Sequence, residues 1–158
     1  MTGAAVGARL AALGLELPPV AAPLAAYVPA LVEGGLVWTS GQLPFVNGEL
    51  PATGVVGEGE GLVPPEDAAH LARICALNAL AAIGSVADLD RVARIVKVVG
   101  FVASAPGFAG QPQVVNGASQ LLGDVFAEAG RHARSAVGVA ALPLGAPVEV
   151  EVVASLSP

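Results

Sequence analysis

An arginine and two glutamates stand in the most apolar part of this sequence, near its C-terminus. Arg134 occurs in the segment His-Ala-Arg-Ser, and Glu149 and Glu151 alternate with valines in Val-Glu-Val-Glu-Val. A buried ion without a partner costs several kcal/mol of folding free energy. These three charges are therefore expected either to pair with one another or to face a site.

The same residue types could bind a small anion. An arginine guanidinium is a planar fork that grips a carboxylate through two charge-assisted hydrogen bonds. Glu149 and Glu151 lie two positions apart, so on a strand both carboxylates share one face. Two carboxylates on one face beside Arg134 favour a site over a core. A structural ion pair across a C-terminal hairpin is the alternative.

Other polar residues could join such a site. Tyr27 is the only tyrosine, Ser40 ends an expected strand, and Asn116 lies in an expected helix. Each also has a structural interpretation: a packed ring with a satisfied hydroxyl, a hydrogen bond at a strand end, and an exposed helix position. His132 is interpreted as a turn residue.

The sequence predicts neither a metal nor an organic cofactor. His70 and His132 have no cysteine or carboxylate neighbours at the spacing of a zinc site. We find no phosphate-binding loop, no dinucleotide fingerprint and no Gly-x-Ser-x-Gly elbow.

The composition indicates one domain that assembles with copies of itself. The chain has 158 residues, of which 54% are hydrophobic and 13% charged. A single domain is expected over residues 1–158, with a helical extension at about residues 1–20. So few charges cannot cover the surface of an ordinary monomer, which favours an oligomer.

The charges also limit the partners and the location. The net charge of -6 and the scatter of the seven Lys and Arg along the chain argue against nucleic acid as a partner. Every apolar run is broken well short of the roughly 20 residues that span a membrane. Arg9 is the only basic residue near the N-terminus, so a secretory signal is not expected. A lone cysteine, Cys75, is expected to be buried and unpaired, and we expect a cytoplasmic protein.

Hydrophobic periodicity and turn residues predict a series of helices and strands. The expected order is a hairpin, a helix, a strand, a helix and a second hairpin, which is an α+β plan with two helices on one face of a mixed sheet. The other face of the sheet would be apolar and uncovered, which favours a closed cyclic oligomer. The expected helices are residues 4–13, 64–84 and about 113–129, and the expected strands are 27–31, 36–40, 92–103, 135–142 and 147–154.

Several motifs together carry a family resemblance. They are Tyr-Val-Pro at 27–29, Gly-Leu-Val-Trp-Thr-Ser-Gly-Gln at 35–42, the Val-rich strand at 96–102, Ala-Arg-Ser at 133–135, Leu-Pro at 142–143 and Val-Glu-Val-Glu at 148–151. In order and spacing they resemble the YjgF/RidA family of reactive-intermediate deaminases, also labelled endoribonuclease L-PSP, across residues 27–154.

The resemblance implies a fold, an assembly and an activity. The fold is the chorismate-mutase-like α+β fold, assembled as a homotrimer with a central barrel-like core and three clefts between subunits. The reaction is hydrolytic deamination of 2-enamine or 2-imino acids to 2-keto acids and ammonia, without a metal or organic cofactor. Arg134 would bind the substrate carboxylate, and Glu149 would orient or deprotonate the attacking water. The residues expected to line the cleft are Tyr27, Ser40, Asn116 and the backbone near Ala136.

Departures from the family pattern surround the expected cleft. His132 stands where a proline is usual, Ala136 where a cysteine is usual, and Ser119 where an aromatic residue is usual. The segment between Phe108 and Asn116 is longer than the common pattern. These differences indicate a divergent, longer subgroup.

Two other functions remain open. Arg134 would serve equally well in a non-catalytic trimeric protein that binds a small carboxylate metabolite. The family also carries the label of endoribonuclease or translation inhibitor, against which the net charge of -6 counts.

Overall fold

The protein has an α+β architecture. The computed structural model describes residues 3–20, 22–23 and 26–158, and within them lie three α-helices and one five-stranded sheet. The elements are α1 (Gly3–Ala12), β1 (Ala30–Glu33), β2 (Leu36–Thr39), α2 (Pro65–Gly84), β3 (Val92–Ala103), α3 (Gln111–Phe126), β4 (Ala133–Val139) and β5 (Val148–Leu156). Three short 3-10 turns lie at Leu89–Arg91, Ala127–Gly130 and Pro143–Gly145.

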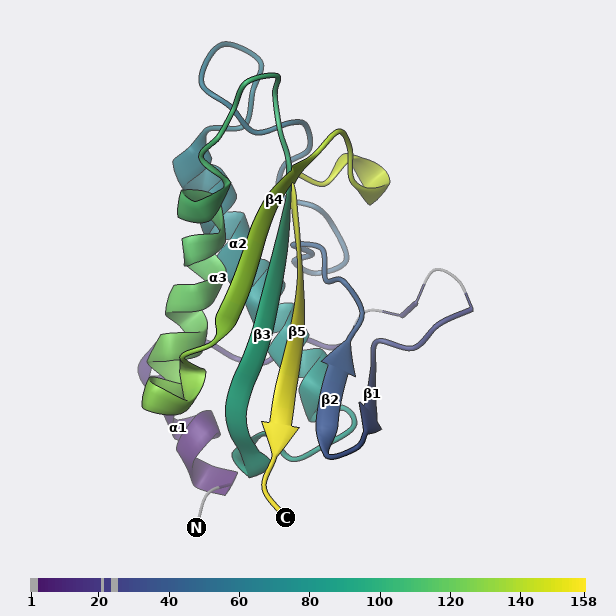
Figure 1. Ribbon diagram of the computed structural model, residues 1–158, viewed down its shortest axis with the longest axis vertical. Helices are drawn as coiled ribbons and strands as arrows, with labels where there is room; N and C mark the ends of the chain where they lie inside the picture. Colours follow the sequence, from purple (N-terminus) through teal and green to yellow (C-terminus); the bar gives the residue numbers. More distant parts are fainter. Residues whose placement is uncertain (1–2, 21, 24–25) are drawn as a thin grey trace.

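The sheet is mixed, and both long helices lie on one of its faces. Its strand order is β1-β2-β5-β3-β4, in which β3 and β4 are parallel and the other neighbours antiparallel. Helices α2 and α3 lie side by side across the sheet (Figure 1). This arrangement confirms the predicted fold class.

The C-terminal hairpin predicted from the sequence is wrong. Strand β3 lies between β4 and β5: Val98 is in register with Arg134 of β4 on one side and with Val152 of β5 on the other. The chain leaves β3, crosses through α3 and returns as β4, and such a crossover makes the two strands parallel. Strand β5 then pairs along the other side of β3.

The N-terminal hairpin is confirmed, but its first strand begins at residue 30 instead of the predicted residue 27. Strands β1 and β2 pair antiparallel, and Gly34 and Gly35 between them have φ values of +59° and +74°. These angles suit the two-residue turns that match the twist of a hairpin. Strand β1 begins at Ala30, after Pro29, because proline has no N–H to donate to a neighbouring strand.

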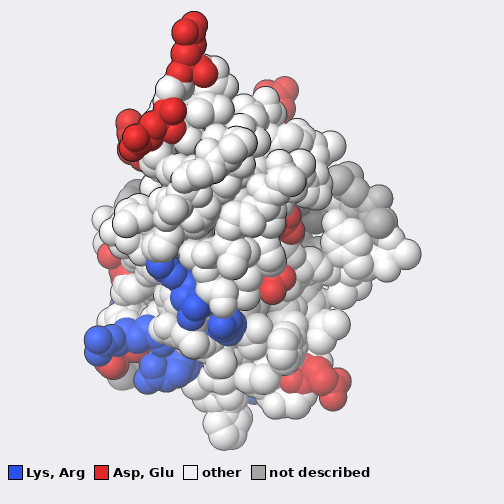
Figure 2. Space-filling view, turned by 45° about the horizontal axis from the view of Figure 1, so that its top comes forward, with Lys and Arg blue, Asp and Glu red and all other residues white. Residues whose placement is uncertain are grey.

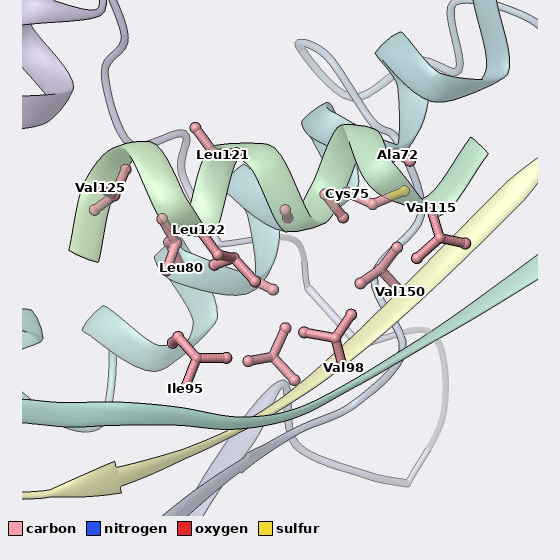
Figure 3. Close-up of a cluster of buried hydrophobic side chains, with 14 of the residues drawn as sticks. Ala72, Cys75, Leu80, Ile95, Val98, Val115, Leu121, Leu122, Val125 and Val150 are labelled. Atoms are coloured by element: carbon pink, nitrogen blue, oxygen red, sulfur yellow. The ribbon is translucent and has the colours of Figure 1, made fainter. Parts of the chain in front are cut away.

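The core lies between the helices and the sheet. Leu80 of α2, Leu122 of α3 and Ile95 of β3 are fully buried and point into the space between the helices and the sheet (Figure 3). The predicted buried cysteine is confirmed, because Cys75 of α2 is fully buried and forms no disulfide. Burial, with a smaller effect of the Glu149 charge, raises the pKa of the Cys75 thiol well above its usual value.

A close approach of the two helices fixes the orientation of α3. A Cβ on Gly117 would overlap the carbonyl oxygen of Ala69 in α2, so only glycine allows this contact. With Gly117 against α2, the polar positions Asn116 and Ser119 lie on another side of α3, toward β4. The glycine therefore helps to place polar side chains beside the edge strand.

The predicted N-terminal helix is confirmed, and it docks on the rest of the chain. Leu10 is buried, and Arg9 Nη1 donates to the Val125 carbonyl oxygen of α3 at 2.7 Å. The Asp90 carboxylate accepts a hydrogen bond from the Val6 amide at 3.0 Å, near the start of α1. A carboxylate in this place satisfies an amide that has no partner inside the helix.

The face of the sheet opposite the helices is exposed in the single chain. Trp38 of β2 is 47% exposed and Val137 of β4 is 43% exposed. Within the described part of the chain, no helix is both long and apolar enough to cross a membrane.

Candidate functional site

Arg134 lies on the helix side of the sheet, at its edge. It is in register with Val98, a buried residue of β3 that faces the helices. Its Nη1 donates to Asn116 Oδ1 at 2.7 Å and to Ser119 Oγ at 3.2 Å, and its Nη2 donates to the Pro112 carbonyl oxygen at 3.2 Å. The guanidinium is thus held along one side of α3.

The acceptors around Arg134 are all neutral. A guanidinium has five N–H groups, and three of them are used in these bonds, which leaves the Nε–H and one Nη2–H without an acceptor among the described residues. Two donors are what a carboxylate needs for a bidentate pair. The ion pairs found in the described ranges, Arg73–Asp124 and Arg131–Glu128, do not involve Arg134. Its charge is therefore available to an external anion.

Two residues beside Arg134 were not predicted as site residues. Ser119 bonds to Arg134, and its hydroxyl also lies 2.9 Å from His132 Nε2. His132 Nδ1 lies 2.6 Å from the Gly130 carbonyl oxygen. The sequence offered one usable signal for Ser119: it is three positions from Asn116, so the two share one side of a helix.

Glu149 lies on the opposite face of the sheet from Arg134. It is in register with Phe101, and its neighbours Val148 and Val150 are buried under the helices. Buried and partly exposed residues alternate along β5, which confirms the prediction that Glu149 and Glu151 share one face. Burial, and to a lesser degree the charge of Glu151, raises the pKa of the Glu149 carboxyl above its usual value of 4.5.

The segment after β2 packs against Glu149. A Cβ on Gly41 would overlap Glu149 Oε1, so the absence of a side chain at this position makes room for the carboxylate. The next residue, Gln42, exchanges two backbone hydrogen bonds with Val150, at 2.8 and 3.0 Å. Gln42 is buried and was not predicted as a functional residue. The predicted residue Ser40 directly precedes Gly41 in the sequence, so these contacts place it near Glu149 in space.

Tyr27 and Ser40 belong to this second group. Ser40 Oγ donates to the Val28 carbonyl oxygen at 2.6 Å, as expected of a residue that forms a hydrogen bond at a strand end. Tyr27 is 49% exposed, which excludes the interpretation as a packed core ring. A small cavity of about 60 Å³ is lined by Tyr27, Gly41 and Gln42, among others.

The predicted site residues therefore form two halves that do not meet within one chain. Arg134 and Asn116 lie at the β4 edge, on the helix side. Ala136 is in this half too, where its side chain packs against the core. Glu149, Ser40 and Tyr27 lie toward the β1-β2-β5 side of the sheet. The predicted ion pair across a hairpin is excluded, because β3 separates the two strands and the side chains lie on opposite faces.

Basic residues that are scattered in the sequence gather around the start of β4. Arg94 Nη1 donates to the Arg131 carbonyl oxygen at 3.2 Å, and Lys97 Nζ donates to Ser135 Oγ at 3.2 Å. Lys97 is in register with Ala133, one position before Arg134, so its side chain lies on the opposite face of the sheet from that of Arg134. Figure 2 shows Lys and Arg side chains clustered on a surface that is otherwise largely uncharged. A local positive field of this kind attracts small anions.

A larger hollow lies elsewhere. It has a volume of about 720 Å³ and is lined by Glu16–Val20, the turn at Phe45–Gly48 and Ile74, Leu77 and Asn78 of α2, among others. It contains none of the predicted site residues. No group of three or more metal-binding side chains occurs within the described residues.

Comparison with known proteins gives a consistent family. The profile of a family described as "YjgF/chorismate_mutase-like, putative endoribonuclease" matches residues 7–156. Protein TCP17 of Trypanosoma cruzi is 44% identical over 160 residues, which cover 96% of this chain and 94% of TCP17.

Solved structures share the fold. The protein Atu1372 of Agrobacterium tumefaciens, of unknown function, is 41% identical with a TM-score of 0.89, over 98% of this chain and 94% of that one. TdcF of Escherichia coli, solved with bound serine, is 26% identical with a TM-score of 0.62, over 89% of this chain and 94% of that one. The lower TM-score of TdcF fits the prediction of a divergent subgroup.

Proposed function

The chain belongs to the YjgF/chorismate-mutase-like family, and from this premise we propose that it hydrolyses 2-enamine and 2-imino acids to 2-keto acids and ammonia. The reaction takes place in clefts between the subunits of a homotrimer, with no metal or organic cofactor. The observation that carries the proposal is the environment of Arg134: a guanidinium held by neutral acceptors, with two N–H donors left for a carboxylate.

Arg134 fixes the substrate through its carboxylate. The bidentate pair sets both the position and the plane of the anion. The C2 carbon, which bears the C=N bond, is directly attached to that carboxylate, so anchoring the anion also positions the reacting carbon.

Glu149 activates the water. Its raised pKa makes it a stronger proton acceptor than an ordinary carboxylate. The carboxylate takes a proton from water as the water oxygen bonds to C2 of the imine, whose nitrogen gains a proton. The resulting carbinolamine then loses ammonia, which breaks the C–N bond and leaves the 2-keto acid. An enamine enters the same route after protonation at C3.

The two halves of the site require a neighbouring subunit. Within one chain Arg134 and Glu149 lie on opposite faces of the sheet, so both can reach one substrate only if Glu149 comes from another copy. Strand β4 is an edge strand, and the sheet face that bears Glu149 is exposed in the single chain. We propose that the β4 edge of one subunit packs on this face of the next.

The direct test is deamination of imino acids generated in the assay by an amino-acid oxidase. We expect the protein to accelerate release of ammonia and of 2-keto acid, and Arg134→Ala to abolish the acceleration. Arg131→Ala is the matched control, since Arg131 is exposed and pairs only with Glu128, and it is expected to keep most of the activity. Absence of acceleration by the wild-type protein over a range of imino acids would refute the proposal.

A binding protein for small carboxylates is the second candidate. The structure of TdcF with bound serine favours it, because that relative holds an amino acid. Titration with keto acids and amino acids would then show saturable binding, lost in Arg134→Ala, without any turnover of imino acids. Binding together with turnover supports the deaminase.

Endoribonuclease activity, which the family description names, is the third candidate. The cluster of basic residues around the start of β4 is in its favour, but the net charge of -6 opposes binding to RNA. Incubation of nuclease-free protein with single-stranded and structured RNA distinguishes an endoribonuclease from the proposed deaminase. The deaminase proposal expects intact RNA.

A further inference from the structure

We infer that Ser119 and His132 are positioning residues, which fix the direction in which Arg134 presents its guanidinium. The inference rests on the proposed role of Arg134 as the carboxylate anchor. It concerns a chain of hydrogen bonds that runs from the Gly130 carbonyl through His132 and Ser119 to Arg134.

The acceptor at one end of this chain determines its direction. A backbone carbonyl can only accept, so the His132 Nδ1 that lies 2.6 Å from the Gly130 oxygen carries a hydrogen and donates it. In the neutral imidazole the other nitrogen, Nε2, is then an acceptor. The Ser119 hydroxyl, 2.9 Å away, donates its hydrogen to Nε2.

The direction of the hydroxyl decides how Arg134 is held. With its hydrogen engaged by His132, the Ser119 oxygen turns its lone pairs outward, and Arg134 Nη1 donates to it at 3.2 Å. A serine hydroxyl without a fixed acceptor rotates freely, and its hydrogen would then compete for the position that Nη1 requires. His132 therefore acts on Arg134 through Ser119.

This hold complements the bond from Asn116. Nη1 donates one hydrogen to Asn116 and the other to Ser119, which fixes the plane of the guanidinium. The remaining donors, the Nε–H and one Nη2–H, therefore point in one direction. Asn116 is an exposed residue, whereas the bond to Ser119 is partly buried and so better protected from competing water. Arginine loses rotamer freedom when it binds a ligand, and a guanidinium already held in place loses less of it.

Two substitutions of His132 separate this role from a merely structural one. The side chain of Gln places its amide oxygen near the position of Nε2, so His132→Gln keeps an acceptor for Ser119. The side chain of Asn reaches only the position of Nδ1, so His132→Asn keeps a donor to Gly130 and loses the bond to Ser119. If His132 only fixed the turn before β4, Asn would be the better replacement.

Steady-state kinetics with an imino acid, and titration with the corresponding 2-keto acid, give the readout. We expect His132→Asn and Ser119→Ala to raise the KM and the keto-acid Kd about five- to tenfold, the size of one ordinary hydrogen bond, with kcat little changed. His132→Gln and Ser119→Thr are expected to restore most of the affinity. Gln120→Ala, an exposed neighbour on the same helix, serves as the control.

The outcomes separate this inference from the proposed function. If Arg134→Ala abolishes turnover and binding while His132→Asn and Ser119→Ala leave KM and Kd unchanged, the positioning role is wrong and the anchor remains. The positioning role is also wrong if His132→Asn retains a KM and a keto-acid Kd closer to wild type than His132→Gln does. If Arg134→Ala itself leaves turnover and binding intact, the proposed function fails first. Thermal unfolding of each variant confirms that it is folded.

Discussion

At the scale of single residues, the pKa of Glu149 connects the structure to the pH dependence of the proposed reaction. A base must be ionised, so activity is expected to fall as the pH drops through the folded-state pKa of Glu149. That pKa lies above the usual 4.5 because of burial and the charge of Glu151. Glu151→Gln removes the second cause, which lowers the pKa of Glu149 and moves the acid limb of the kcat/KM profile to lower pH. A profile that does not move would show that Glu149 is not the titrating base.

The same carboxylate has a cost in stability that can be measured. Its pKa is higher in the folded than in the unfolded chain, so the folded state binds the proton more tightly, and Glu149 lowers the free energy of unfolding as the pH rises above 4.5. Glutamine at this position carries no charge, so the free energy of unfolding of Glu149→Gln does not fall in this way as the pH rises. We expect the variant to be inactive yet more stable than wild type at pH 7, with the difference shrinking toward pH 4. Urea unfolding at both pH values and at one protein concentration measures it.

The sequence was sufficient to single out the charged groups but not their geometry. Arg134 and Glu149 stood out because charges in an apolar stretch are unusual, and in the structure both side chains are partly exposed. Ser119 and His132 were missed because a serine and a histidine are unremarkable in a helix and a turn. Their contact depends on how α3 packs against β4, which no local pattern records.

At the scale of elements, a single glycine sets the distance between the two helices. Gly117→Ala would bring a methyl group into the Ala69 carbonyl of α2 and is expected to destabilise the protein by about 1–3 kcal/mol. Gly123→Ala, in the same helix, meets nothing within 4 Å and should be neutral or stabilising by about 0.5–1 kcal/mol, since alanine favours a helix. Urea unfolding of the two variants gives the comparison. Equal effects would mean that the close approach does not limit packing.

Helices and strands could be predicted to within about three residues at each end, whereas the order of strands could not. Strand β3 was predicted with the bounds that the structure has, and α2 begins at Pro65 with acidic residues in its first turn. The hairpin prediction failed because β4 and β5 are consecutive in sequence and joined by a short connection, the usual condition for a hairpin. The crossover through α3 had already placed β4 beside β3. Strand β5 takes the opposite side of β3, with nine residue pairs in register.

At the scale of the whole molecule, the exposed sheet face and the divided site point to the same assembly. The face that carries Glu149 also carries exposed Trp38 and Leu31, an apolar surface that favours burial against another copy. The residues proposed to bind the carboxylate and to activate the water lie on different faces of one chain. The proposed assembly would therefore both cover the open face and complete the proposed site.

Mixed oligomers test whether the two halves of the site come from different subunits. Arg134→Ala and Glu149→Gln are each expected to be inactive, because every cleft lacks either its anchor or its base. When the two variants are unfolded and refolded together, a cleft shared between neighbours receives an intact anchor and an intact base in about one quarter of random combinations in a cyclic trimer. Activity should therefore return to roughly that fraction of wild type. If both groups came from one chain, no combination would restore a cleft and the mixture would stay inactive. Refolding each variant alone is the control, because it shows that activity depends on mixing.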